Sequence, residues 1–301
     1  MRFSLFPSPQ QPWSDVLALA QHIEATGWDG IWFPDHFMPD GAEVNAPVLE
    51  CWTALAGLAT AVPRIRLGSL VSGNTYRHPA VLAKIATTVD HLSGGRLVLG
   101  LGAGWQENEH RAYGIDFYDT AERLARLDEA CQVVKGLLGH ERATWKGRFY
   151  ELQDAPLEPK PVQPQLPLLV GGGGERVTLR IAAKYADEWN TWGTPETMRH
   201  KIAVLERHCA DVGRDPAEIK KSTQALLFMR DDPEWLAARR AADTGVQPMI
   251  IGTPTEVRST LEAYADAGVD EFVLPDFTLG RGDRKLATID QFLAEAAGAL
   301  G

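Results

Sequence analysis

The sequence predicts an α/β fold, a (β/α)8 barrel of the TIM type with an insertion between strands 4 and 5. Short apolar runs alternate with helical patterns along the whole chain, which is the rhythm of βα units. A joint made of a helix end, a glycine and a buried strand recurs near both ends of the chain, at 25–34 and 265–275. Repeated joints favour a closed barrel over two unlike domains, although open doubly wound sheets also contain them. We therefore expect one domain over 1–301, with an insertion at about 105–165.

Each expected strand is a short apolar run. The eight runs are 2–6, 28–33, 65–71, 97–101, 168–170, 188–191, 222–229 and 271–274. The first helix is expected to start at the capping residue Ser14 and to end at Gly27. Further helices are expected at 49–61, 79–92, 120–138 and 283–299.

The expected insertion has structure of its own. It combines the helix at 120–138 with a small hairpin at 143–152 and a proline-rich return at 156–167. Loops at the active face of a barrel set specificity, so we expect the insertion and the segment 230–249 to roof the pocket.

Composition excludes several classes of function. With 45% hydrophobic and 23% charged residues, the chain is a folded protein and not a disordered one. A net charge of -10 argues against nucleic acid or a membrane surface as partner and leaves a small molecule. Three widely spaced cysteines, with no signal or membrane-spanning segment, predict a cytoplasmic protein. No metal-ligand motif is present, so no metal is expected.

A histidine follows the second expected strand, where a barrel places catalytic groups. His36 comes directly after Asp35, and imidazole titrates in the range useful for proton transfer. The alternative is a histidine that is hydrogen-bonded for structure alone. His78 precedes Pro79 at a helix start and is expected to cap or shape that turn.

Four consecutive glycines, at 171–174, follow the fifth expected strand. Their backbone N–H groups and a helix starting near Glu175 would favour a phosphate, with Arg77 and Arg176 as added cations. A plain tight turn is the alternative, and the charge of Glu175 opposes phosphate binding. The glycines at 100–104 fail the spacing of a dinucleotide fingerprint, so we interpret them as a wall for a planar ring beside Trp105.

Four motifs occur in order along nearly the whole chain. They are 32–37, 67–69 with 77–79, 99–105 with 109–114, and 169–174 with 186–190. Each alone is weak, but the combination resembles the luciferase-like monooxygenase superfamily, and specifically its branch that uses the deazaflavin coenzyme F420.

The resemblance implies a barrel mouth that holds the deazaflavin ring against strands two to four and its phosphate at the glycine turn. It implies that Asp35 and His36 lie beside the ring as the catalytic pair, with His36 exchanging a proton with substrate. It also implies a non-prolyl cis peptide between Leu70 and Val71. The residues expected to bind the cofactor are Leu70, Val71, Arg77, Gly102, Ala103, Gly104, Gly171, Gly172, Gly173, Gly174 and Arg176.

One position departs from the pattern. Sugar-phosphate dehydrogenases of this branch carry a glutamate just after the glycine pair of strand four, and this chain has Ala103 there. Their substrate and mechanism are therefore not carried over, although Glu107, Asn108 and Glu109 lie nearby in sequence.

The leading hypothesis is an F420-dependent oxidoreductase that moves a hydride between the deazaflavin and a small organic substrate, with His36 as acid/base. One alternative is a two-component monooxygenase that uses reduced FMN and oxygen. Another is a barrel that binds flavin without catalysis. The family also implies a homodimer, while the identity of the substrate is not encoded in a readable motif.

Overall fold

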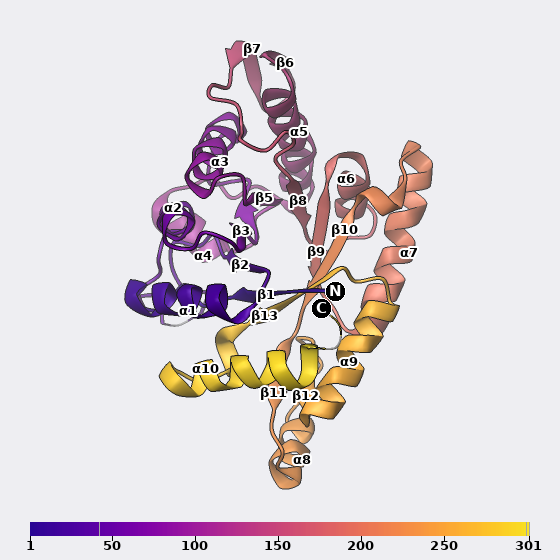
Figure 1. Ribbon diagram of the computed structural model, residues 1–301. Coiled ribbons are helices and arrows are strands. Elements are labelled where there is room, and N and C mark those ends of the chain that lie inside the picture. The colour runs from indigo at the N-terminus through magenta and orange to yellow at the C-terminus, as the bar shows by residue number, and fades with distance from the viewer. Residues whose placement is uncertain (42, 299, 301) are drawn as a thin grey trace.

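Eight parallel strands close into a barrel in the computed structural model, which describes residues 1–41, 43–298 and 300 (Figure 1). The barrel strands are β1 (Arg2–Phe6), β2 (Gly30–Phe33), β3 (Arg66–Ser69), β5 (Leu97–Gly102), β8 (Leu168–Gly171), β9 (Glu188–Trp192), β10 (Lys220–Gln224) and β13 (Glu271–Pro275). They pair in the order β3-β2-β1-β13-β10-β9-β8-β5, and a β3–β5 pairing closes the ring. The predicted (β/α)8 barrel is thus confirmed.

Helices surround this barrel. They are α1 (Trp13–Thr26), α2 (Cys51–Ala61), α3 (Pro79–Ser93), α6 (Thr178–Tyr185), α7 (Pro195–Val212), α9 (Pro254–Asp266) and α10 (Gly282–Gln291), with the short 3-10 helices η1 (Pro216–Glu218) and η2 (Asp276–Thr278) and the π-helix η3 (Phe292–Ala297). Gly27 ends α1 in the left-handed conformation, as expected. Ser14 does not cap this helix, because the carbonyl of Pro12 already accepts the first helical N–H groups. The α-helix expected at 283–299 ends at Gln291. Residue 299, the last of the expected range, lies outside the described residues.

The segment between β5 and β8 contains α4 (Glu107–Tyr113), α5 (Thr120–Gly139) and an antiparallel hairpin, β6 (Arg142–Lys146) with β7 (Glu151–Pro156). The expected hairpin is confirmed. A buried carboxylate on α5, Glu129, holds its turn by accepting hydrogen bonds from the Trp145 indole at 3.0 Å and from the backbone N–H of Tyr150 at 2.9 Å.

The strand expected at 222–229 is wrong in extent. The barrel strand β10 ends at Gln224, and after Ala225 the chain leaves the barrel as β11 (Leu226–Met229). That strand pairs with β12 (Met249–Gly252) in a separate two-stranded parallel sheet, joined by α8 (Pro233–Ala241). Only Ala225 separates the two strands, and no glycine or proline marks the break, so the sequence pattern runs through the point where the pairing partner changes.

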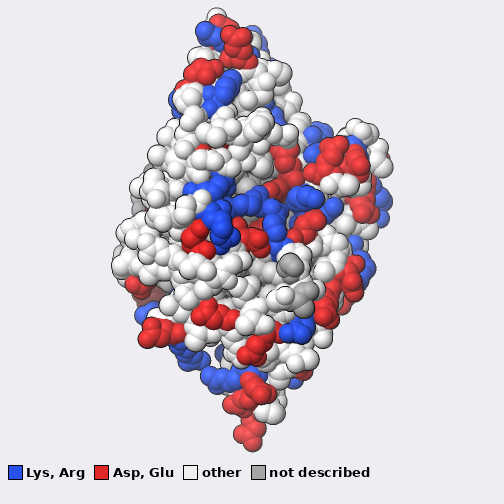
Figure 2. All heavy atoms as spheres, viewed as in Figure 1, with Lys and Arg blue, Asp and Glu red and all other residues white. Residues whose placement is uncertain are grey.

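The barrel interior is charged at the end where the strands begin. Glu271 accepts hydrogen bonds from Ser4 at 2.6 Å and from the Trp32 indole at 2.8 Å, and Arg2 and Arg66 pair with it at 3.1 and 3.2 Å. Figure 2 shows this face, on which basic and acidic side chains gather around the middle. No helix of the described residues is long and apolar enough to cross a membrane. The opposite end of the barrel is left for the site.

Candidate functional site

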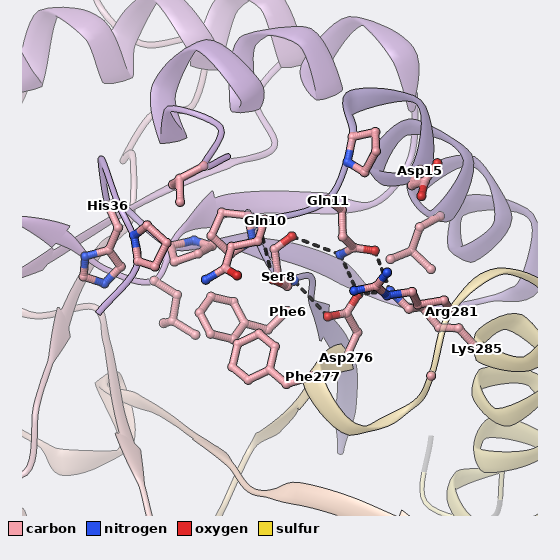
Figure 3. Close-up of a pocket in the computed structure, with 18 of the residues that line it drawn as sticks. Phe6, Ser8, Gln10, Gln11, Asp15, His36, Asp276, Phe277, Arg281 and Lys285 are labelled. Carbon is pink, nitrogen blue, oxygen red and sulfur yellow. Dashed lines mark hydrogen bonds and ion pairs between the residues drawn. The ribbon is translucent and has the colours of Figure 1, made fainter. Parts of the chain in front are cut away.

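A cavity of about 1040 Å³ opens at the ends of the barrel strands. Strand ends and the loops after them supply its wall, which includes Phe6, His36, Leu70, Trp192, Gln224 and Asp276. In Figure 3, His36 lies at one side of the cavity, Asp276 and Lys285 lie at the other, and the rings of Phe6 and Phe277 lie between them. The cavity therefore has titratable groups at two sides, with aromatic side chains and the polar Ser8 and Gln10 between them.

His36 is held by a carboxylate from another element. Its Nδ1 lies 2.8 Å from Oε1 of Glu109 on α4, whose side chain is 0% exposed. The backbone N–H of Phe37 donates to the other oxygen of Glu109 at 2.7 Å, and the Tyr76 hydroxyl also donates to this carboxylate. An ionised carboxylate on Nδ1 places the ring proton there and leaves Nε2 as the nitrogen available to the cavity.

The environment keeps Glu109 ionised. Burial alone would raise the pKa of Glu109, but hydrogen bonds from His36, Tyr76 and the Phe37 amide outweigh burial and lower it. Burial and the bond to Glu109 raise the pKa of the Tyr76 hydroxyl, so this hydroxyl stays a donor. Glu109 and His36 can therefore act as an orienting carboxylate and a proton-transfer group.

Asp35 does not reach the cavity. Its buried carboxylate forms two bonds with the Arg77 guanidinium, at 2.6 and 3.1 Å, and Arg77 also binds Glu50 at 2.6 Å. Burial raises the pKa of Asp35, and the charge and hydrogen bonds of Arg77 oppose that rise. This pairing corrects two expectations: Arg77 is neutralised within the loops and not directed at a phosphate, and Asp35 supports the loop that carries His36.

The Leu70–Val71 peptide bond is cis, as the resemblance implied. Leu70 lines the cavity, while Val71 packs inside the barrel mouth. A side chain at Gly102 would place its Cβ 2.6 Å from a Val71 methyl, and one at Gly171 would come within 2.8 Å of both methyls. These two glycines therefore make room for Val71, and neither lines the cavity.

The other residues of the first glycine loop, Ala103 and Gly104, also lie outside the cavity wall. Ala103 packs against the hydrophobic core, and Gly104 has a positive φ of 81°. The next residue, Trp105, is 60% exposed, lines the cavity and meets the His36 ring edge-on at 5.5 Å. Of the residues 102–105, Trp105 lines the cavity.

The glycine turn after β8 leaves backbone donors free. In the described part of the chain, the N–H groups of Gly173 and Gly174 have no hydrogen-bond acceptor, and Gly172 has a φ of 122° that favours glycine. The helix expected near Glu175 starts later, at Thr178, because residues 175–177 form a turn.

Charges next to this turn differ from those expected. Arg176 is exposed, whereas Lys201 of α7 lies under the turn, with its Cε 3.3 Å from the Cβ that a side chain at Gly173 would have. Lys201 and His200 bind the Glu175 carboxylate at 2.8 and 3.1 Å. The negative charge that opposed phosphate binding is thus balanced by a cation that the sequence analysis missed.

Residues 1–246 match the luciferase-like monooxygenase family. The chain belongs to this family. The F420-dependent glucose-6-phosphate dehydrogenase of Kineococcus radiotolerans is 30% identical to it over 292 residues, which cover 84% of each chain.

Solved structures show that other proteins share the fold of this luciferase-like chain. The coenzyme F420-dependent tetrahydromethanopterin reductase of Methanopyrus kandleri has a TM-score of 0.81 at 18% identity, covering 100% of this chain and 99% of that one. A long-chain alkane monooxygenase also has a TM-score of 0.81, at 15% identity, covering 99% and 91%.

The roof of the luciferase-like site is smaller than we expected. Of the insertion at 105–165, only Trp105 and Gln106 line the cavity, and of the segment 230–249 only Gln247 does. Segments near the chain ends contribute more, since 8–12 and 280–286 together supply eleven of the residues that line the cavity. The hairpin β6–β7 instead packs against α5, which turns it away from the cavity.

Two further wall residues of this luciferase-like chain escaped the sequence analysis. Gln224 was placed inside a longer strand, so its position at a strand end was hidden. Lys285 falls within the helix expected at 283–299, a pattern that does not indicate its partners; in the structure it binds Asp276 and Gln11. If the expected strand had ended at Gln224, this residue would have been recognised as a strand end at the active face of the barrel.

Proposed function

We propose that this protein is an F420-dependent oxidoreductase that moves a hydride between C5 of the deazaflavin and a small organic substrate. The observation that carries the proposal is His36, bonded to the buried carboxylate of Glu109 and facing a cavity that Leu70 of the cis peptide also lines. The F420-dependent relative, similar over 84% of each chain, supports the choice of cofactor.

The residues present fit such a cofactor. A cavity of about 1040 Å³ has room for a ring system and a substrate together, since pockets for one small ligand commonly run from about 300 to 1,000 Å³. Leu70 and Trp105 would contact the ring. The free N–H groups of Gly173 and Gly174, with Lys201 beside them, would hold the phosphate.

When bound, F420 supplies a carbon that accepts or donates the hydride. In the oxidation of an alcohol, Nε2 of His36 takes the hydroxyl proton as the carbon gives up its hydride, and a carbonyl compound is formed. Glu109 stabilises the resulting imidazolium through the Nδ1–H bond. In the reverse direction the same nitrogen returns the proton to the carbonyl oxygen.

Replacing His36 with alanine tests the proposal. The H36A variant should bind F420 with nearly the wild-type Kd and lose about 10²- to 10⁴-fold in turnover of probe alcohols, since general acid–base catalysis contributes that much. Cyclohexanol, 2-propanol and glucose 6-phosphate serve as probes. Unchanged turnover would remove His36 from catalysis, and cofactor binding without turnover of any alcohol or aldehyde would favour a flavin carrier.

A monooxygenase that uses reduced FMN is the second candidate, because the alkane monooxygenase shares this fold. Fluorescence titration separates the two. Tight binding of F420 with little affinity for FMN supports the dehydrogenase, and the reverse result overturns it.

We also propose that the protein works as a homodimer in the cytoplasm, as its family resemblance implies. Neither duplex DNA nor anionic vesicles should bind it, because the chain carries a net charge of -10. Sedimentation equilibrium measures the assembly state, and a monomer at all concentrations would contradict the dimer.

A further inference from the structure

Gln224 presents a buried side-chain oxygen that accepts no hydrogen bond from the part of the chain that the structure describes. The residue is 3% exposed, ends β10 and lines the cavity. Its Oε1 is buried and has no hydrogen-bond partner within residues 1–41, 43–298 and 300. Buried polar groups are nearly always hydrogen-bonded, so an unpaired amide on the wall of a cavity points to a ligand.

The neighbours of Gln224 explain why the amide is left over. In the barrel register it lies between Trp192 of β9 and Val273 of β13; valine has no polar side-chain atom, and within the described residues the Trp192 indole does not donate to the Gln224 oxygen. Two residues earlier in β10, on the same face of the strand, Ser222 accepts a hydrogen bond from the Asn190 side-chain amide at 2.9 Å. Polar groups deeper in the barrel are therefore satisfied internally, whereas the one at the mouth is not.

The charges on the cavity wall do not suit a phosphate dianion. The wall carries one lysine, one arginine and four aspartates, namely Asp15, Asp40, Asp276 and Asp283. Lys285 is already bonded to Asp276 at 2.5 Å. The helices α1 and α10 begin beside the cavity, but each has an aspartate in its first turn, which offsets its positive end.

We propose that Gln224 is a substrate-binding residue and that the substrate is an uncharged alcohol or its carbonyl product with a second hydroxyl group. The reacting hydroxyl meets His36, the second hydroxyl donates to Oε1 of Gln224, and the carbon frame packs on Phe6 and Trp192. This inference rests on the proposed function, because it takes His36 as the reacting end of the cavity.

Paired probe alcohols and one variant test the inference in the holoenzyme, the protein loaded with F420. Cyclohexanol and cyclohexane-1,4-diol differ by a single hydroxyl, and glucose and glucose 6-phosphate differ by a phosphate. We expect wild type to prefer the diol in kcat/KM, and Q224L to lose about tenfold on the diol with little change on cyclohexanol, the size of one hydrogen bond. The phosphate should not improve glucose as a substrate.

Stability separates a binding role from a structural one. Because Oε1 of Gln224 has no partner among the described residues, Q224L should keep or raise the Tm, whereas a structural glutamine would lower it. The matched control is Q21L on the exposed face of α1, which should change neither kcat/KM nor the preference for the diol.

Several results would overturn the inference. They are an equal loss on both ring alcohols, a lower Tm in Q224L, a weaker F420 complex in Q224L, a higher kcat/KM for glucose 6-phosphate than for glucose, or no turnover of any uncharged probe. A wild-type protein that fails to bind F420 would instead overturn the proposed function, and the titration that precedes the assay reveals it.

Discussion

Changing Glu109 to glutamine removes one charge from the site and keeps its shape. The carboxylate accepts from His36, Tyr76 and the Phe37 N–H, so with an amide at least one of these donors must face an NH₂ group. An unsatisfied buried donor costs about 1–3 kcal/mol of stability. The imidazolium that forms at His36 also loses a charge-assisted bond of about 1.5–3 kcal/mol, which corresponds to about a 10- to 100-fold lower kcat at 1.36 kcal/mol per decade.

The assay for E109Q is single-turnover reduction of bound F420 by a probe alcohol, with the F420 Kd measured in parallel. E107Q is the matched control, because Glu107 lies on the same helix, is 57% exposed in its side chain and pairs with the exposed Arg111. We expect E107Q to behave as wild type. A kcat for E109Q within threefold of wild type, in a folded protein that binds F420 normally, would refute the role assigned to Glu109.

The same variant has a pH signature. The pKa of Glu109 is lower in the folded protein than its ordinary value of 4.5, so its stabilising effect is fully present above pH 4.5 and is lost as pH falls through the folded pKa. Urea unfolding at a series of pH values should therefore show a smaller acid loss of stability in E109Q than in wild type. If the free energy of unfolding fell equally with decreasing pH in the two proteins, the lowered pKa of Glu109 would be contradicted.

Two further substitutions test the charges around the cofactor. K201M should weaken F420 about tenfold, or 1.4 kcal/mol, and leave a deazaflavin that lacks the phosphate unaffected, since Lys201 lies under the glycine turn; equal effects on both ligands would contradict this. R77M should lower the free energy of unfolding by about 3–5 kcal/mol, because it leaves the buried Asp35 carboxylate without its cation. The control R111M breaks an exposed pair and should cost under about 0.5 kcal/mol, and similar losses in the two arginine variants would argue against the buried ion pair.

Local signals predicted the fold because each barrel unit repeats them. Gly27 ends a helix in the left-handed conformation, and His78 accepts from the Ala80 N–H as the cap of α3. Such features depend on a few neighbouring residues, so a sequence pattern contains them in full. The same holds for the hairpin at 143–152, whose strands are short and adjacent.

Contacts between side chains that lie far apart in the sequence were not predictable in this way. Glu109 reaches His36 over 73 positions, and Arg77 reaches Asp35 over 42. A charged residue near the end of a loop can bind a ligand or pair with a carboxylate far away in the sequence. Which of the two it does depends on how α4 and the loops pack together. The exchange of pairing partners at Ala225 is similar, since no turn residue separates β10 from β11 and both strands pair in parallel.

The electrostatics of the molecule explain how an acidic protein can hold an anionic cofactor. The charge of Arg77 is paired with Asp35 and Glu50. Arg2 and Arg66 lie at the opposite end of the barrel and are paired with Glu271. In our proposal, phosphate recognition then falls mainly to backbone N–H groups, which carry no net charge, with Lys201 offsetting the charge of Glu175 beside them. Contacts of this kind are short-ranged, so cofactor affinity should depend only weakly on ionic strength, and a steep salt dependence would require a cation cluster that this arrangement does not provide.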